Sequence, residues 1–144
     1  NVAFASAAFF VDLTPPETAL ELLGAFRRAG ATTYALAGTP LRLSATDYPA
    51  GPGGAGVAAS YLSASGGAAG GGAPVMLAGS TVLPAGRYAL AFASVDRVGN
   101  FESTRTAGLK LDGDPPAAVT DLRLAGLSSH TALLSWTAPG DDGF

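Results

Sequence analysis

The sequence predicts an all-β protein built around a sandwich of two sheets, and three observations support this prediction. Short runs in which apolar and polar residues alternate recur along the chain. Clusters of Gly, Pro and Asp separate these runs at the spacing typical of a sandwich, and the 144 residues include 20 Gly and 10 Pro. With 48% hydrophobic and only 13% charged residues, the chain can bury a core and is not a disordered polyelectrolyte.

The individual strands follow from this alternation, which is clearest in residues 41–46 and 87–92. We expect one face of each strand to be buried, namely Leu41, Leu43 and Ala45 in the first and Tyr88, Leu90 and Phe92 in the second. Further strands are predicted over residues 57–64, 74–77 and 101–112.

Residues 14–36 carry conflicting signals. Thr14 before two prolines, an early Glu17 and late arginines followed by Gly30 are typical of a helix from residue 18 to 28. The all-β character of the remaining chain favours a strand over residues 18–23 and a hairpin through residues 27–36 instead. We prefer the strands, and the helix remains the alternative.

An internal repeat divides the chain. Val11–Pro16 and Leu111–Pro116 share the pattern apolar-Asp-x-x-Pro-Pro at a spacing of 100 residues. Prolines restrict the backbone and donate no amide hydrogen to a sheet, so both segments are predicted to be interdomain linkers. We therefore expect the last strand of a preceding β domain plus a linker in residues 1–12, a complete sandwich in 13–112, and a linker plus two strands of an incomplete domain in 113–144.

Four motifs in residues 11–103 carry a family resemblance: VDLTPPET from Val11, TPLRLSATD from Thr39, GGAGVAASYL from Gly53 and LPAGRYALAFASVDRVGNFES from Leu83. In this order they resemble the bacterial immunoglobulin-like repeats of surface and secreted proteins. The resemblance implies an immunoglobulin-like β-sandwich with partial flanking β domains. It also implies a D-x-x-G-N turn at 96–100, in which Gly takes a positive φ and Asp and Asn cap amides, and a tyrosine corner at 83–88.

Residues 115–143 resemble the opening of a fibronectin type III domain. The resemblance implies a first strand through Val119, Leu122 and Leu124 and a second strand from which Leu134 and Trp136 face inward. Apolar strands with open edges need a cover. We expect neighbouring domains of the same polypeptide or identical subunits to supply it.

Side chains with oxygen ligands gather in the predicted turns and linkers: Asp12, Asp47, Asp96, Asn100, Asp112 and Asp114. Calcium takes such ligands from loops, and it is the one cofactor that the sequence suggests. Among these residues, Asp112 and Asp114 are the preferred candidates for calcium ligands. Capping of turns explains the same residues without a metal.

No catalytic residue and no other cofactor site is predicted, so the chain is not expected to be an enzyme. The glycine run 66–72 lacks the Gly-Lys-Ser/Thr ending of a phosphate-binding loop, the serines are not in a G-x-S-x-G elbow, and His130 is the single histidine in a chain without cysteine. A net charge of −3 without a basic stripe argues against nucleic-acid binding. The longest apolar stretch, residues 3–11, is too short for a membrane span.

These expectations combine into a non-catalytic structural or adhesive module, one unit of a tandem array in a secreted or cell-surface bacterial protein. One alternative is a self-assembling extracellular filament subunit joined by β-strand addition. Another is an accessory carbohydrate-binding module that uses Tyr34, Tyr48 and Tyr61 as an aromatic platform. Partners would then include identical subunits, or host and surface glycans and proteins.

Overall fold

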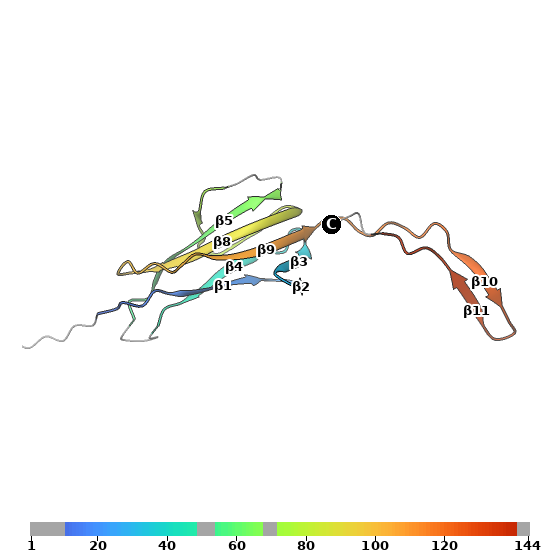
Figure 1. The fold of residues 1–144 in the computed structure, drawn as a ribbon, viewed down its shortest axis with the longest axis horizontal. Helices are drawn as coiled ribbons and strands as arrows, with labels where there is room; N and C mark the ends of the chain where they lie inside the picture. Colours follow the sequence, from blue (N-terminus) through green and yellow to red (C-terminus); the bar gives the residue numbers. More distant parts are fainter. Residues whose placement is uncertain (1–10, 49–53, 68–71, 141–144) are drawn as a thin grey trace, which may run out of the picture.

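The computed structural model describes residues 11–48, 54–67 and 72–140, and these residues form an all-β structure without an α-helix (Figure 1). None of the described residues therefore lies in a helix long and apolar enough to cross a membrane. The strands are β1 (Glu17–Leu22), β2 (Phe26–Ala29), β3 (Thr32–Leu36), β4 (Leu41–Thr46), β5 (Val57–Gly66), β6 (Val75–Met76), β7 (Ser80–Thr81), β8 (Gly86–Asp96), β9 (Arg105–Asp112), β10 (Arg123–Leu127) and β11 (Ala132–Ser135).

Strands β1 to β9 form two sheets that share one core. The smaller sheet has the order β1-β4-β7, and the larger has the order β2-β3-β9-β8-β5-β6. All neighbouring strands are antiparallel except β3 and β9, which are parallel. Leu41 of the smaller sheet and Leu90 and Leu109 of the larger sheet are at most 1% exposed and belong to the same hydrophobic cluster.

The predicted alternation is confirmed in both diagnostic strands. In β4, Leu41 is buried and Leu43 is partly buried against the core, whereas Arg42 is exposed. In β8, the residues Tyr88, Leu90 and Phe92 are all buried. Because successive side chains of a strand point to opposite faces, this period of two decides which half of each strand enters the core.

The strand interpretation of residues 14–36 is confirmed, and the helix alternative is wrong. Strand β1 pairs along its whole length with β4, from Glu17 opposite Thr46 to Leu22 opposite Leu41. Strands β2 and β3 form the expected hairpin, and β3 adds to the sheet beside β9. The strands form in place of the helix because β1 pairs with β4 and β3 pairs with β9, which satisfies the backbone hydrogen bonds and lets β1 contribute to the core.

Other predicted strand limits shift. The strand expected over 101–112 begins at Arg105, and Phe101 makes only an isolated bridge with Val95. The Glu102 amide still donates to the Ser94 carbonyl oxygen of β8, while the Glu102 carboxylate accepts from the amides of Thr18 and Ser94. The strand expected at the start of the chain lies outside the described residues.

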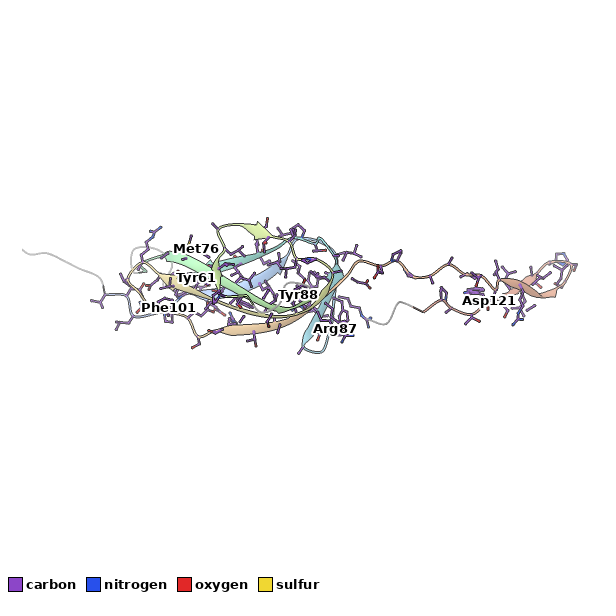
Figure 2. The ribbon with its side chains drawn as sticks, turned by 90° about the horizontal axis from the view of Figure 1, so that it is seen from above. Tyr61, Met76, Arg87, Tyr88, Phe101 and Asp121 are labelled. Atoms are coloured by element: carbon purple, nitrogen blue, oxygen red, sulfur yellow. The ribbon has the colours of Figure 1, made fainter. Side chains whose placement is uncertain are left out.

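The tyrosine corner forms as the resemblance implies. The Tyr88 hydroxyl donates a hydrogen bond of 3.0 Å to the Pro84 carbonyl oxygen, four residues upstream. Tyr88 is 4% exposed and points into the sandwich (Figure 2). Gly67 approaches its ring so closely that an added Cβ would lie 2.4 Å from it, so only glycine fits at this position.

Strands β10 and β11 form a separate hairpin, joined to the sandwich by an extended segment (Figure 1). The Asp121 carboxylate closes its open end by accepting hydrogen bonds from the Thr137 amide and from its hydroxyl, at 3.0 and 2.6 Å. Leu134 and Trp136, which the resemblance places facing inward, are 50% and 52% exposed. No second layer covers them among the described residues, because the sandwich has closed around its own core.

Candidate metal site

Three carboxylates converge at the end of the sandwich where the N-terminal linker, defined here as residues 11–16, meets the sheets (Figure 1). Asp12 lies in this linker, Asp47 directly follows β4 and Asp96 ends β8. One oxygen atom of each carboxylate lies within 4.8 Å of the other two. We call Asp12, Asp47 and Asp96 the aspartate cluster.

Asp96 is held by the turn that follows β8. Its Oδ1 accepts hydrogen bonds from the amides of Val98 and Asn100, at 2.9 and 2.8 Å. Gly99 supplies the positive φ of +97° that the turn requires. Burial alone would raise the pKa of Asp96, but the hydrogen bonds from Asn100, Val98 and Gly99 together outweigh it and hold this pKa below its ordinary value.

Asp47 carries an oxygen without a hydrogen-bond partner. Its side chain is anchored because Oδ2 accepts a hydrogen bond of 2.6 Å from the Gly56 amide. The residue is only 7% exposed, and its Oδ1 is buried with no partner among the described residues. An unsatisfied buried acceptor costs about 1–3 kcal/mol, and more when it is charged. This atom therefore marks a place where a ligand would stabilise the fold.

Asp12 ties the linker to two loops. Its Oδ1 accepts from the Thr14 amide at 3.0 Å, and its Oδ2 accepts from the Ala55 amide at 2.6 Å. Its carbonyl oxygen accepts from Nδ2 of Asn100 at 3.0 Å. The sequence includes Asp12 among the candidate calcium ligands, although it favours Asp112 and Asp114.

Asn100 plays a different part from the one that the resemblance implies. Its side chain does not cap amides in the described structure but donates from Nδ2 to the Asp12 carbonyl and to Oδ2 of Asp96, at 3.0 and 2.7 Å. Asn100 thereby holds the linker against the turn and orients one member of the aspartate cluster.

Asp112 and Asp114, the two residues that the sequence favours as calcium ligands, do not join the aspartate cluster. Strand β9 runs antiparallel to β8, which places Asp112 at the opposite end of the sheet from Asp96. There, the Asp114 amide donates to Oδ1 of Asp112 at 3.0 Å. This is the same local turn that Thr14 makes with Asp12, but no second amide is bonded to the Asp112 carboxylate among the described residues, whereas Ala55 bonds that of Asp12.

No ion pair within 4.0 Å joins an arginine or lysine to the aspartate cluster among the described residues. The ion pairs among the described residues use the acids Glu17, Glu21 and Glu102. The Arg97 guanidinium lies over Gly56, with Nη1 3.5 Å from the Cβ position of that glycine, but it is not within 4.0 Å of a cluster carboxylate.

The three tyrosines proposed as a sugar platform are spread over the surface. Tyr34 of β3 and Arg87 of β8 both pair with Lys110 of β9, so Tyr34 lies at the height of Arg87 in the sheet. Tyr61 of β5 pairs with Ala93, which lies six residues further along β8. Six residues along a strand correspond to about 20 Å, and Figure 2 shows Tyr61 and Arg87 well apart. Tyr48 lies in the loop after β4. These residues do not form one flat binding face.

Comparison with protein-family models, with curated proteins and with solved structures finds no match for this chain.

Proposed function

We propose that this chain contains a non-catalytic structural module with an immunoglobulin-like fold, which separates neighbouring domains of a secreted or cell-surface bacterial protein. The observation that carries the proposal is the position of the two linkers. They lie at opposite ends of the sandwich (Figure 1), and at each of them an aspartate accepts a hydrogen bond from the amide two residues later, just before a Pro-Pro pair.

This arrangement suits a spacer in a tandem array. A chain that enters at one end and leaves at the other extends an array by the full length of the sandwich. Pro-Pro pairs fix the φ angles and stiffen each linker between domains, so the array keeps its extended length. The tyrosine corner at Tyr88 and the position of β3 beside β9 support the immunoglobulin-like assignment.

The β10–β11 hairpin fits the first two strands of a fibronectin type III domain. An isolated two-stranded hairpin is marginal in water, and the half-exposed Leu124, Leu134 and Trp136 offer an apolar face for a further sheet. Further strands of the same polypeptide would cover this face.

The proposal is tested by replacement in the full-length polypeptide. Residues 13–112 are exchanged for an unrelated β-sandwich of equal end-to-end length, and a deletion of the same residues serves as comparison. The attachment of cells to a surface is then measured. A spacer predicts that the exchange preserves attachment and that the deletion weakens it. An exchange as damaging as the deletion would show that the module's own surface is recognised, and would refute the spacer proposal.

A second candidate, a filament subunit joined by strand addition, is favoured by a groove of about 860 Å³ beside β1. Strand β1 is the edge of its sheet, and the groove is lined by β1, β2 and β9. Glu102 and Arg105 already bond the amide and the carbonyl of Thr18, so an added strand would pair beyond Thr18. The occupant would be residues 1–11 of another copy.

The filament candidate predicts polymers that disappear when residues 1–11 are deleted, as measured by analytical ultracentrifugation of the native material. Polymers that survive the deletion, or a chain that remains monomeric at high concentration, would refute it.

A further inference from the structure

We propose that the aspartate cluster binds one Ca²⁺ ion, with carboxylate oxygens of Asp12, Asp47 and Asp96 as the protein ligands. The inference goes beyond the structural role proposed above. It makes the connection between the N-terminal linker and the sandwich dependent on a divalent cation.

Two independent observations point to a cation. The first is the convergence of three carboxylates from segments far apart in the sequence, with one oxygen of each within 4.8 Å of the others. The second is Oδ1 of Asp47, a carboxylate oxygen that is buried and lacks any partner among the described residues. Turn capping accounts for Oδ2 of Asp47 and for both oxygens of Asp96, but it leaves this atom unexplained.

The chemistry of the ligands favours calcium. Calcium binds oxygen ligands at about 2.3–2.6 Å, so two ligands on opposite sides of one ion lie about 4.6–5.2 Å apart, which accommodates the 4.8 Å limit of the cluster. Zinc prefers sulfur and nitrogen ligands, whereas the chain has no cysteine and its His130 lies in the β10–β11 hairpin. Water would complete the shell of 6–8 ligands.

The site would be largely preorganised. Backbone amides of Gly56 and Ala55 hold Asp47 and Asp12, and the turn after β8 holds Asp96. A bound ion would join the linker, the segment after β4 and the end of β8 at one point. Because Asp12 is the linker's ligand, we expect calcium to restrict motion of residues 11–14, and this mechanical consequence rests on the proposed spacer role.

The experiment uses the whole 144-residue chain, treated with a chelator and dialysed into calcium-free buffer. Titration with CaCl₂ is followed by isothermal calorimetry, and the thermal midpoint is followed by circular dichroism. We expect one Ca²⁺ per chain and a midpoint that rises with calcium concentration, since a ligand of the folded state alone stabilises it. No binding heat at millimolar calcium together with an unchanged midpoint would overturn the proposal, as would tighter binding of Mg²⁺ than of Ca²⁺.

Matched variants locate the site. Asp47→Asn removes a charge while keeping an acceptor for the Gly56 amide, and we expect it to weaken calcium binding about tenfold or more. Asp112→Asn changes the equivalent aspartate of the other linker and should bind as the original chain does. Asp12→Asn, at a partly buried position of the N-terminal linker, provides a second ligand variant.

The chelated variants should melt within a few degrees of the chelated original chain, which shows that they fold. Binding unchanged in both Asp47→Asn and Asp12→Asn, or lost equally in Asp112→Asn, would overturn the assignment. Failure to bind calcium would leave the replacement test of the spacer role intact, because that test measures attachment and involves no ligand variant.

Discussion

Replacing Thr18 with valine should weaken the contact between the two sheets. Thr18 lies in β1 of the smaller sheet and is 0% exposed. Its hydroxyl donates to Oε2 of Glu102 and shares a hydrogen bond of 2.6 Å with the hydroxyl of Ser94 in β8. Valine keeps the shape of threonine but cannot make either bond, so the change tests the hydrogen bonds with little change in packing volume.

The magnitude follows from the partners. A neutral buried hydrogen bond contributes about 0.5–1.5 kcal/mol, and one to a charged group about 1.5–3 kcal/mol. In the Thr18→Val variant, the Glu102 carboxylate still accepts hydrogen bonds from the amides of residue 18 and Ser94, so the variant does not leave an unsatisfied charge. We expect Thr18→Val to lower the free energy of unfolding by about 2–4 kcal/mol, out of the roughly 5–15 kcal/mol typical of a domain.

The assay is urea denaturation followed by far-ultraviolet circular dichroism, because Trp136 lies outside the sandwich and does not report on it. The midpoint should fall with an unchanged slope, and the thermal midpoint should fall by roughly 10–25 °C. Thr106→Val, at an exposed position of β9, is the matched control and should change stability by less than about 0.5 kcal/mol. A loss below about 1 kcal/mol for Thr18→Val would refute the claim that this network joins the sheets.

Three further predictions address the tyrosine corner, a crowded glycine and the hairpin. Tyr88→Phe loses one part-buried hydrogen bond to the Pro84 carbonyl oxygen and should lower the free energy of unfolding by about 1 kcal/mol, measured by urea denaturation. Gly66→Ala should cost about 1–3 kcal/mol or more, because φ is +100° and a Cβ would lie 2.4 Å from a backbone oxygen, whereas Gly79→Ala meets nothing within 4 Å and should be neutral. The pKa of Asp121, followed by NMR, should lie below its ordinary value of 3.8, because hydrogen bonds from the hydroxyl and the amide of Thr137 stabilise the carboxylate. Because this pKa is lowered, the hydrogen bonds from Thr137 to the Asp121 carboxylate stabilise the hairpin above pH 3.8, and this stabilisation is lost as the pH falls through the lowered pKa.

Each of these predictions has a contradicting result. Unchanged stability of Tyr88→Phe would show that the corner does not contribute, and equal effects of the two glycine variants would contradict the crowding at Gly66. For Asp121, the control is Thr137→Val, which removes the hydroxyl and should return the pKa toward 3.8. A titration midpoint of Asp121 at or above 3.8 in the original chain would contradict its stabilisation by the Thr137 hydrogen bonds.

Much of the fold can be predicted from local patterns in the sequence. Period-two alternation identified the buried faces of β4 and β8, and the turn residues of 96–100 and the corner at Tyr88 formed where they were expected. These features depend on neighbouring residues, so a single sequence contains their causes. The start of β9 differs from the expected one, because the segment from Phe101 pairs with β8 only through an isolated bridge and the Glu102 amide, and the Glu102 side chain contacts Thr18 across 84 residues.

The sequence by itself determined which residues could be metal ligands, and it suggested calcium from their chemistry. Only the tertiary structure decided which of them meet. Asp12, Asp47 and Asp96 are separated by 35 and 49 residues, and their convergence depends on which strand ends share one end of the sandwich. Asp12 and Asp112 have the same local motif, yet one gains two distant carboxylates and the other does not. Proximity of this kind is set by strand direction and pairing, which no short pattern around either aspartate contains.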